Sequence, residues 1–323
     1  MLKDQIIVPI SIVFKKNLEI DFKNTKKHIL FLIKKKVKVF YLAQSASELE
    51  RMSQEERFKV AKFVAKIVNN KAKLIYQPLA YTHINDQIKE AKKLISLGCY
   101  ALVIKPLKEK GKQDFYSTRF KMSEYNSARH DYLYYNYMKK ICEKLSIPII
   151  FHHDNINNGR GINFKILQKI LSIKKIIALK EHNKSLKVRN KIYKKFGKKL
   201  VCYDGFSKKD FISSYKNGAS AKHSNFSWFE PQWDRLYMNL LKEKKYNLVK
   251  KLCKIENIIK KSIILTGYAG YKELIKHHNI INVSGYTRMP GCNLTVNQRK
   301  IIKISFLKFK KEQRKFYQKL RLI

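Results

Sequence analysis

This sequence has no long apolar run, and we expect no cleavable leader. No stretch approaches the roughly 20 consecutive apolar residues that a membrane-spanning helix needs. The apolar run near the N-terminus has no small-residue cleavage site, and Pro9 interrupts it, which favours a buried strand over a signal peptide. We therefore expect a cytoplasmic protein with no membrane partner.

Closely spaced cysteines are missing as well. The five cysteines show neither a CxxC pair nor a Cys/His ligand spacing, which argues against a structural zinc site. An odd number of distant cysteines without a signal sequence is typical of reduced thiols. The cysteines are Cys99, Cys142, Cys202, Cys253 and Cys292.

Acidic residues are scarce: 24 Asp and Glu stand against 70 Lys and Arg, a formal net charge of +46. The lysines are spread over almost the whole chain, and Ile and Asn are abundant, as an AT-rich coding sequence would produce. We therefore favour compositional bias over a nucleic-acid function and do not expect specific nucleic-acid binding. Such a charge attracts anions in general and speeds the capture of acidic substrates.

Eight short apolar runs alternate with longer amphipathic segments along the chain. The runs lack strict polar alternation, which is typical of parallel strands buried on both faces. No GxGxxG follows any of them, so about eight strand-then-helix units favour a barrel over an open doubly wound sheet. The runs begin at Ile6, Val39, Lys73, Ala101, Ile147, Ile176, Leu200 and Ala219.

The predicted fold is therefore an α/β protein, a (β/α)8 TIM barrel with extra C-terminal helices. We place the barrel in residues 1–230 and a helical extension packed on it in residues 231–323. Helix starts agree with this reading: Ser53 with Glu56 forms a capping box, and Asn163 precedes another apolar helical face. Gly98 and Gly218 stand where tight turns would lead into strands.

Chemistry in such a barrel is carried by the carboxyl ends of the strands. Lys180 stands there, at the end of the apolar run Ile176–Leu179. Burial disfavours an ammonium ion, so a lysine in this place tends toward the neutral, nucleophilic amine. The alternative is a structural lysine paired with its neighbour Glu181.

Four histidines also fall at predicted strand ends, which raises the alternative of a metal site with nearby Asp and Glu. Adjacent His152 and His153 would point to opposite sides of their strand, however. We therefore expect neither a metal nor a cofactor. The four histidines are His152, His153, His182 and His223.

At this point the sequence resembles the dihydrodipicolinate synthase/N-acetylneuraminate lyase family of class I aldolases, from Val8 to about Arg299. The resemblance rests on the order and spacing of several short segments. In the family the lysine that ends the sixth strand forms the Schiff base, which implies this role for Lys180. The matching segments are Glu48–Arg57, Ile177–Glu181, Tyr203–Gly205, Gly218–Ala221 and Leu294–Arg299.

The chain departs from the family around the mouth of the barrel. The Gly-Thr-Thr-Gly-Glu loop that holds the substrate carboxylate corresponds to 44–48 here, which implies Ser45 and Ser47 as substrate-binding residues. The resemblance also implies Arg160 as a carboxylate partner. The family's proton-relaying tyrosine on the fifth strand falls on Phe151 or His152, and His152 would supply an imidazole in place of the phenol.

The sequence thus predicts a Schiff-base lyase or synthase, of aldolase or dehydratase type, acting on pyruvate or a longer 2-keto acid. Lys180 and His152 are the expected catalytic residues, and similar proteins imply a homo-oligomer. Two alternatives stay open. One is a diverged, metal-dependent barrel that uses strand-end His, Asp and Glu. The other is a basic binding protein for RNA or acidic partners.

Overall fold

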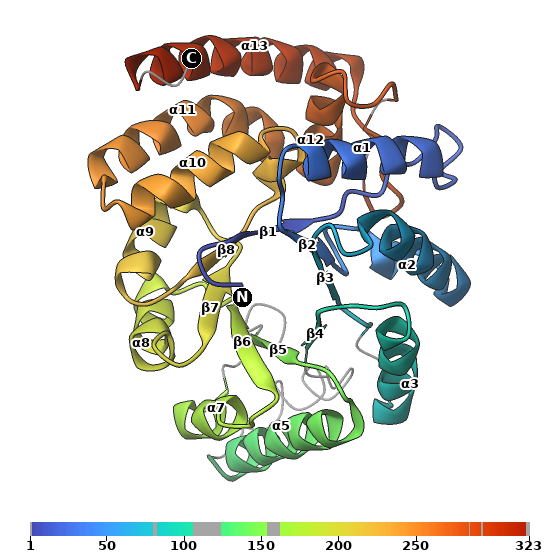
Figure 1. Ribbon diagram of the computed structural model, residues 1–323, viewed down its shortest axis with the longest axis vertical. Coiled ribbons are helices and arrows are strands. Elements are labelled where there is room, and N and C mark those ends of the chain that lie inside the picture. The colour runs from blue at the N-terminus through green and yellow to red at the C-terminus, as the bar shows by residue number, and fades with distance from the viewer. Residues whose placement is uncertain are drawn as a thin grey trace. The chain divides into compact units, whose positions relative to one another are not determined.

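A computed structural model of the chain describes residues 2–79, 83–105, 124–153, 162–283, 285–291 and 293–320, with the side chains of 124–131 excepted. Within them, parallel strands form a closed barrel in the order β1-β2-β3-β4-β5-β6-β7-β8 (Figure 1). This confirms the predicted (β/α)8 barrel. The strands are β1 Ile6–Pro9, β2 Val39–Leu42, β3 Lys73–Tyr76, β4 Ala101–Ile104, β5 Ile149–His153, β6 Ile176–Glu181, β7 Val201–Asp204 and β8 Ala221–His223.

Helices alternate with these strands, and further helices follow β8, as the sequence predicts. The helices are α1 Phe22–Lys34, α2 Gln54–Val68, α3 Ile84–Ile95, α5 Glu124–Lys144, α7 Phe164–Leu171, α8 Leu186–Phe196, α9 Lys208–Lys216, α10 Pro231–Lys242, α11 Tyr246–Ile264, α12 Gly267–His277 and α13 Val296–Lys319. Short 3-10 turns cover η1 Leu49–Arg51 and η2 Asn225–Trp228. In the part of the chain that the structure covers, no helix combines the length and the apolar character that crossing a membrane requires.

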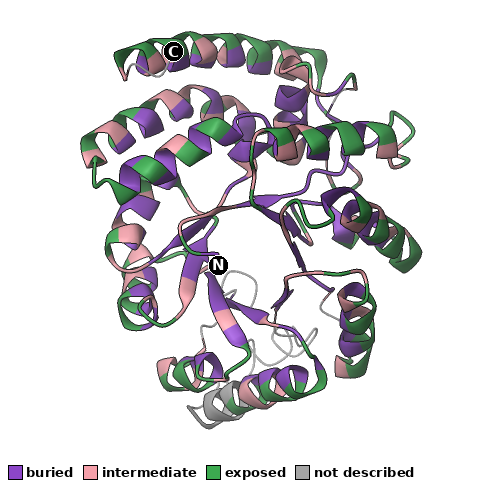
Figure 2. Cartoon of the chain, viewed as in Figure 1, coloured by how far each residue is buried: buried purple, intermediate pink, exposed green. Residues whose placement is uncertain are grey.

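The strands are buried along most of their length, whereas the helices expose one face to solvent (Figure 2). All four residues of β4 have no exposed surface. Burial on both faces explains why the strand sequences are continuously apolar.

Local signals in the sequence set the helix boundaries. Ser53 and Glu56 form the predicted capping box of α2, and the side chain of Asn163 accepts from the backbone N–H of Lys165 at the start of α7. Gly98 and Gly218 have φ angles of +78° and +108°, a region that costs residues with a Cβ about 1–2 kcal/mol.

Contacts between residues divide the chain into two compact units. One unit contains residues 1–73, 207–212 and 222–323, and the other contains 74–206 and 213–221. The boundary at residue 230 drawn from the sequence stays a prediction.

The C-terminal helices pack together inside the first unit. Helix α13 contacts α11 and α12, and the aromatic rings of Phe309, Phe316 and Tyr317 surround the buried Trp233 at centroid distances of 5.5–5.7 Å. The indole of Trp228 donates a hydrogen bond to the carbonyl of Pro9 at the end of β1 (2.5 Å). These contacts tie the residues that follow β8 to the first strand.

Buried charges in the same unit are paired. The ammonium of Lys208 lies between the carboxylates of Asp234 and Glu256, and all three side chains are at most 3% exposed. Burial opposes the charge of Lys208, but the two carboxylates raise its pKa above the ordinary value. The triad joins the start of α9 to α10 and α11.

Buried His28 should make the free energy of unfolding depend on pH. It has no exposed surface on α1, and its Nε2 donates to the carbonyl of Trp228 (2.9 Å). Burial lowers its pKa from 6.5 to about 4, so the unfolded chain binds more protons in this window. The free energy of unfolding should therefore fall as the pH drops from 6.5 to 4, with His28 contributing up to about 3 kcal/mol.

Urea unfolding at a series of pH values tests this expectation. His28→Gln keeps an N–H donor but cannot be protonated, so its stability should depend less on pH between 6.5 and 4 than that of the unaltered chain. Equal slopes for the two proteins would contradict the expectation.

Candidate active site

Three side chains share one side of β5, β6 and β7 near the carboxyl ends of the strands. The register pairs His152 with Lys180 and Lys180 with Tyr203. Because side chains alternate along each strand, residues paired in parallel register point to the same side. His152, Lys180 and Tyr203 therefore form a row, called the inner row below.

The inner row faces the inside of the barrel. One residue further along β7, the carboxylate of Asp204 accepts a hydrogen bond from the hydroxyl of Tyr193 on α8 (3.1 Å). Helix α8 lies outside the strands (Figure 1), so Asp204 points outward and its neighbour Tyr203 points inward.

Lys180 is nearly sequestered from solvent. Its side chain is 5% exposed, and it occupies the penultimate position of β6. The adjacent Glu181 points to the other side of the strand, where its carboxylate accepts from Nδ1 of His153 (2.7 Å). Glu181 therefore forms its ion pair with His153 of the neighbouring strand.

His152 is buried beside Lys180, at 4% exposed. Its Nε2 lies 3.3 Å from Nδ1 of His182, and the two rings meet edge to face with centroids 4.9 Å apart. Burial lowers the pKa of His152 well below its ordinary value, and the charge of Lys180 adds to the effect. At neutral pH the imidazole of His152 is therefore uncharged.

The outer side of the same strand ends holds the row in place. Glu181 accepts a second hydrogen bond from the backbone N–H of Asn183 (2.7 Å), and Asp204 accepts from the N–H of Phe206 (3.1 Å). The guanidinium of Arg189 lies 4.0 Å from the centroid of the Phe206 ring and donates to the carbonyl of Asn183 (2.7 Å). These contacts fix the chain where it leaves β6 and β7.

Ser45 and Ser47, the predicted carboxylate-binding residues of the turn after β2, belong to the first unit, and the inner row belongs to the second. Their role in binding stays a prediction. Ser47 is buried, and its hydroxyl accepts from the N–H of Ala43 (3.1 Å), which closes the turn after β2. Ser45 is exposed and donates to Glu50 (3.3 Å). Arg160 lies outside the described residues.

Comparison with known proteins decides the family. The model of the dihydrodipicolinate synthetase family matches residues 3–122 and 125–305. This chain belongs to that family. None of the curated proteins matches the sequence.

Solved structures share the fold at low sequence identity. CdNal from Clostridium difficile, in complex with mannosamine, is 18% identical with a TM-score of 0.82, over 96% of this chain and 99% of that one. N-acetylneuraminate lyase from Fusobacterium nucleatum is 19% identical with a TM-score of 0.79, over 95% and 99%. Dihydrodipicolinate synthase from Oceanobacillus iheyensis is 16% identical with a TM-score of 0.78, over 97% of both chains.

The register bears on the two residues considered for the place of the family tyrosine. Phe151 is paired with Leu179, whereas His152 is paired with Lys180. Of these two residues, the one that shares a side of the sheet with Lys180 is therefore His152.

The sequence did not predict the positions of two residues of the site, Tyr203 and His182. Tyr203 is fully buried, and its hydroxyl has no hydrogen-bond partner in the described part of the chain. The feature of the sequence that could have indicated Tyr203 is its place directly before Asp204 and Gly205, at the end of a predicted strand. His182 was placed at a strand end and weighed as a metal ligand, but its contact with His152 depends on the turn after β6.

A metal site was the alternative role for the strand-end histidines. Within the described ranges, no three or more His, Cys, Asp or Glu side chains gather as ligands. Asp154, which stands beside the histidines of β5 in the sequence, lies outside those ranges.

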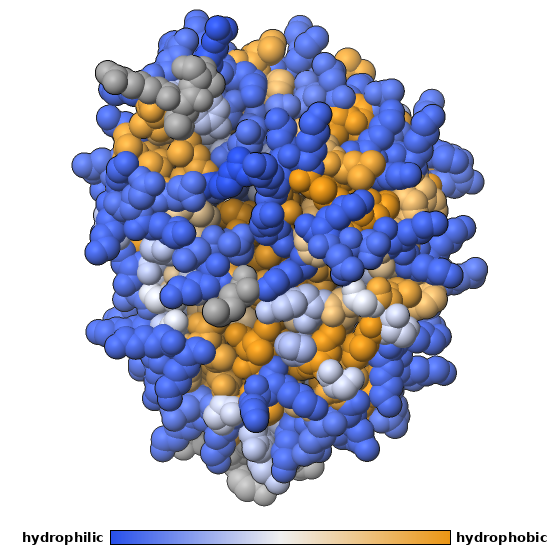
Figure 3. All heavy atoms as spheres, in the orientation of Figure 1, coloured by the Kyte–Doolittle hydropathy of each residue, from blue (hydrophilic) through white to orange (hydrophobic). Residues whose placement is uncertain are grey.

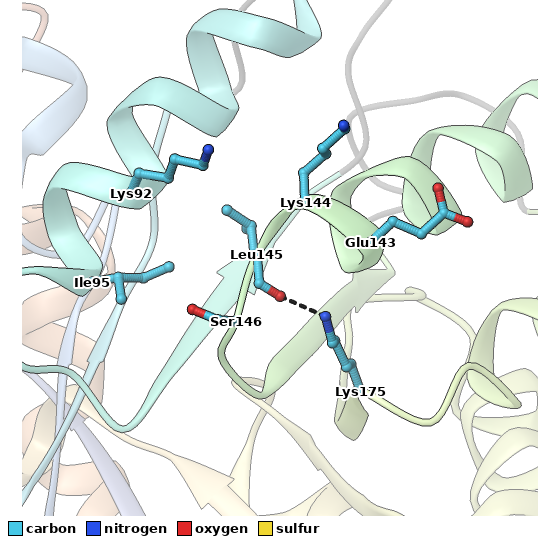
Figure 4. A pocket seen from close by; sticks show the side chains of 7 residues that line it. All are labelled: Lys92, Ile95, Glu143, Lys144, Leu145, Ser146 and Lys175. Carbon is cyan, nitrogen blue, oxygen red and sulfur yellow. Dashed lines mark hydrogen bonds between the residues drawn. The ribbon is translucent and has the colours of Figure 1, made fainter.

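A hollow of about 380 Å³ lies at the opposite ends of the same strands (Figure 4). Lys175 directly precedes β6, and its ammonium donates to the carbonyls of Cys142 (2.6 Å) and Leu145 (2.7 Å). A cation at the C-terminus of α5 complements the helix dipole, so this lysine has a structural partner. The hollow is lined by Lys92, Ile95, Glu143, Lys144, Leu145, Ser146 and Lys175.

The surface gives no sign of one concentrated polar patch on the face seen in Figure 3, where hydrophilic side chains are spread over many elements. This agrees with the even distribution of lysines along the sequence.

Glu181 should be needed for the stability of this region. Glu181→Leu would leave the buried Nδ1 of His153 and the N–H of Asn183 without their acceptor, so we expect the free energy of unfolding to fall by about 2–3 kcal/mol in urea. Glu143→Leu, on the exposed surface of α5, serves as the control and should change stability by at most about 0.5 kcal/mol. Equal stabilities of the two variants would contradict the assignment.

Proposed function

We propose that the chain is a Schiff-base-forming lyase or synthase that acts on pyruvate or a longer 2-keto acid through Lys180. The observation that carries the proposal is a buried lysine near the carboxyl end of β6, in register with a buried histidine, in a chain of the dihydrodipicolinate synthetase family. Membership of this family indicates a lyase-type enzyme. The proposal adds the class of substrate and the residue that forms the Schiff base.

Lys180 would supply the nucleophile. Burial disfavours the ammonium form, and a neutral amine can add to the C2 carbonyl of a keto acid. Loss of water from the adduct leaves an iminium, which draws electrons from the neighbouring bond and so allows a C–C or C–O bond to break.

His152 would carry the protons of these steps. Protons must reach the departing oxygen as water leaves and must be removed from C3 of the iminium. An imidazole that is uncharged at neutral pH can accept a proton, return it, and stay clear of repulsion with a protonated Lys180. Its buried position in register with Lys180 supports this role.

The substrate carboxylate needs its own partners. We propose Ser45 and Ser47 in the turn after β2, together with Arg160, on the strength of the family resemblance. A guanidinium fork suits bidentate binding of a carboxylate. The net charge of +46 would favour the capture of any acidic substrate at low salt.

Replacement of Lys180 tests the proposal. The protein is incubated with pyruvate or longer 2-keto acids, reduced with borohydride, digested and analysed by mass spectrometry. The unaltered chain should give an adduct on the peptide that contains Lys180, because reduction converts the imine into a stable secondary amine. Lys180→Ala should give no adduct and should lose all turnover of the keto acid.

Lys180→Arg is the matched control, since it keeps a long cationic side chain that cannot form the imine. Both variants must keep the circular-dichroism spectrum and melting temperature of the parent within a few degrees. Undiminished turnover in Lys180→Ala, or the absence of any adduct in the folded parent, would rule the mechanism out.

A further inference from the structure

The contact between His152 and His182 links a buried group to a more exposed one. His152 is 4% exposed, whereas His182, just beyond the end of β6, is of intermediate exposure. Nε2 of the first ring lies 3.3 Å from Nδ1 of the second, within hydrogen-bonding distance for one shared proton.

The ring of His182 also packs against an aromatic ring of the turn after β7. The ring of Phe206 meets that of His182 at a centroid distance of 5.7 Å and an interplanar angle of 68°. The guanidinium of Arg189 lies 4.0 Å from the centroid of the Phe206 ring, and the backbone N–H of Phe206 donates to Asp204. His182 is therefore held against His152 by the turns that follow β6 and β7.

The other ring nitrogen of His152, Nδ1, makes no hydrogen bond with His182. Nδ1 of His152 is buried and has no hydrogen-bond partner among the described residues. Groups of this kind are normally satisfied, so a buried nitrogen without a partner points to a ligand. The charged and titratable groups that act on His152 are Lys180, His182, Lys105 and His153.

We propose that His182 is the second member of a proton relay, which carries protons between His152 and solvent during imine chemistry at Lys180. The inference rests on the proposed function and adds to it a residue with a defined part in proton transfer. His152 would touch the substrate, and His182 would act through His152.

The relay has a simple balance of atoms and electrons. A C3–H bond of the iminium breaks, its electron pair forms the C2–C3 double bond, and the C–N π pair moves to nitrogen. Nδ1 of His152 takes the C3 proton while its Nε2 gives a proton to Nδ1 of His182. Nε2 of His182 then releases a proton to water, and the reverse sequence returns one.

Exchange of the methyl protons of pyruvate in deuterium oxide, followed by NMR, measures this step without knowledge of the second substrate. The parent chain should catalyse the exchange. His182→Ala should slow it about 100-fold, the lower end of what general acid–base catalysis contributes. Added imidazole should restore at least a tenth of the parent rate, because the free ring can occupy the vacated space.

His182→Gln separates a relay from a positioning contact. A glutamine amide can still hydrogen-bond His152, but it does not pass a proton on, so this variant should be as slow as His182→Ala and should not respond to imidazole. Exchange at the parent rate in either variant would overturn the relay. His83→Gln, a change of an exposed histidine before α3, is the control.

Borohydride trapping on the same samples keeps the two proposals apart. If the relay is correct, the His182 variants still give the Lys180 adduct after long incubation, which also shows that they are folded. An adduct with unchanged exchange would overturn only the relay. The absence of an adduct in the parent would overturn the proposed function, and the relay with it.

Discussion

The parallel pairing of β5, β6 and β7 is the constraint on which the candidate site depends. Because side chains alternate along a strand, this register sends His152, Lys180 and Tyr203 to one side and His153, Glu181 and Asp204 to the other. A slip of one residue in β5 would exchange the two histidines and bring an apolar ring beside the lysine. The chemistry proposed for the site therefore follows from backbone pairing before any side chain is considered.

The outer side of these strands is where the register is secured. The carboxylate of Glu181 is bonded to His153 of the neighbouring strand and to the chain that follows β6. On the next strand, the carboxylate of Asp204 likewise accepts hydrogen bonds from the hydroxyl of Tyr193 and the backbone N–H of Phe206. The two outer carboxylates are thus satisfied by neighbouring groups. Among the described residues, Nδ1 of His152 and the hydroxyl of Tyr203 on the inner side have no hydrogen-bond partner, and neither does Nε2 of His153 on the outer side.

Much of the fold could be read from the sequence because its signals are local. Each apolar run became a strand, Ser53 and Asn163 capped the helices that they were expected to start, and Gly98 and Gly218 took positive φ angles. Lys180 was found by a general rule about where barrels place their chemistry, and the family assignment then held over nearly the whole chain.

The site itself was less predictable, for physical reasons. Strands buried on both faces lack a polar alternation, so the sequence did not decide between Phe151 and His152. The meeting of His152 with His182 depends on how two turns fold over the strand ends, and no local pattern encodes it. Ser47 has a structural contact that the sequence did not predict: its hydroxyl accepts from the N–H of Ala43 in its own turn. Its part in substrate binding stays a prediction.

A crystal structure of the chain after borohydride reduction in the presence of pyruvate would test the central claim most directly. The account predicts continuous density between Nζ of Lys180 and C2 of the reduced keto acid, with the ring of His152 between the adduct and His182. Pyruvate bound without a covalent link, with Lys180 unmodified, would contradict it.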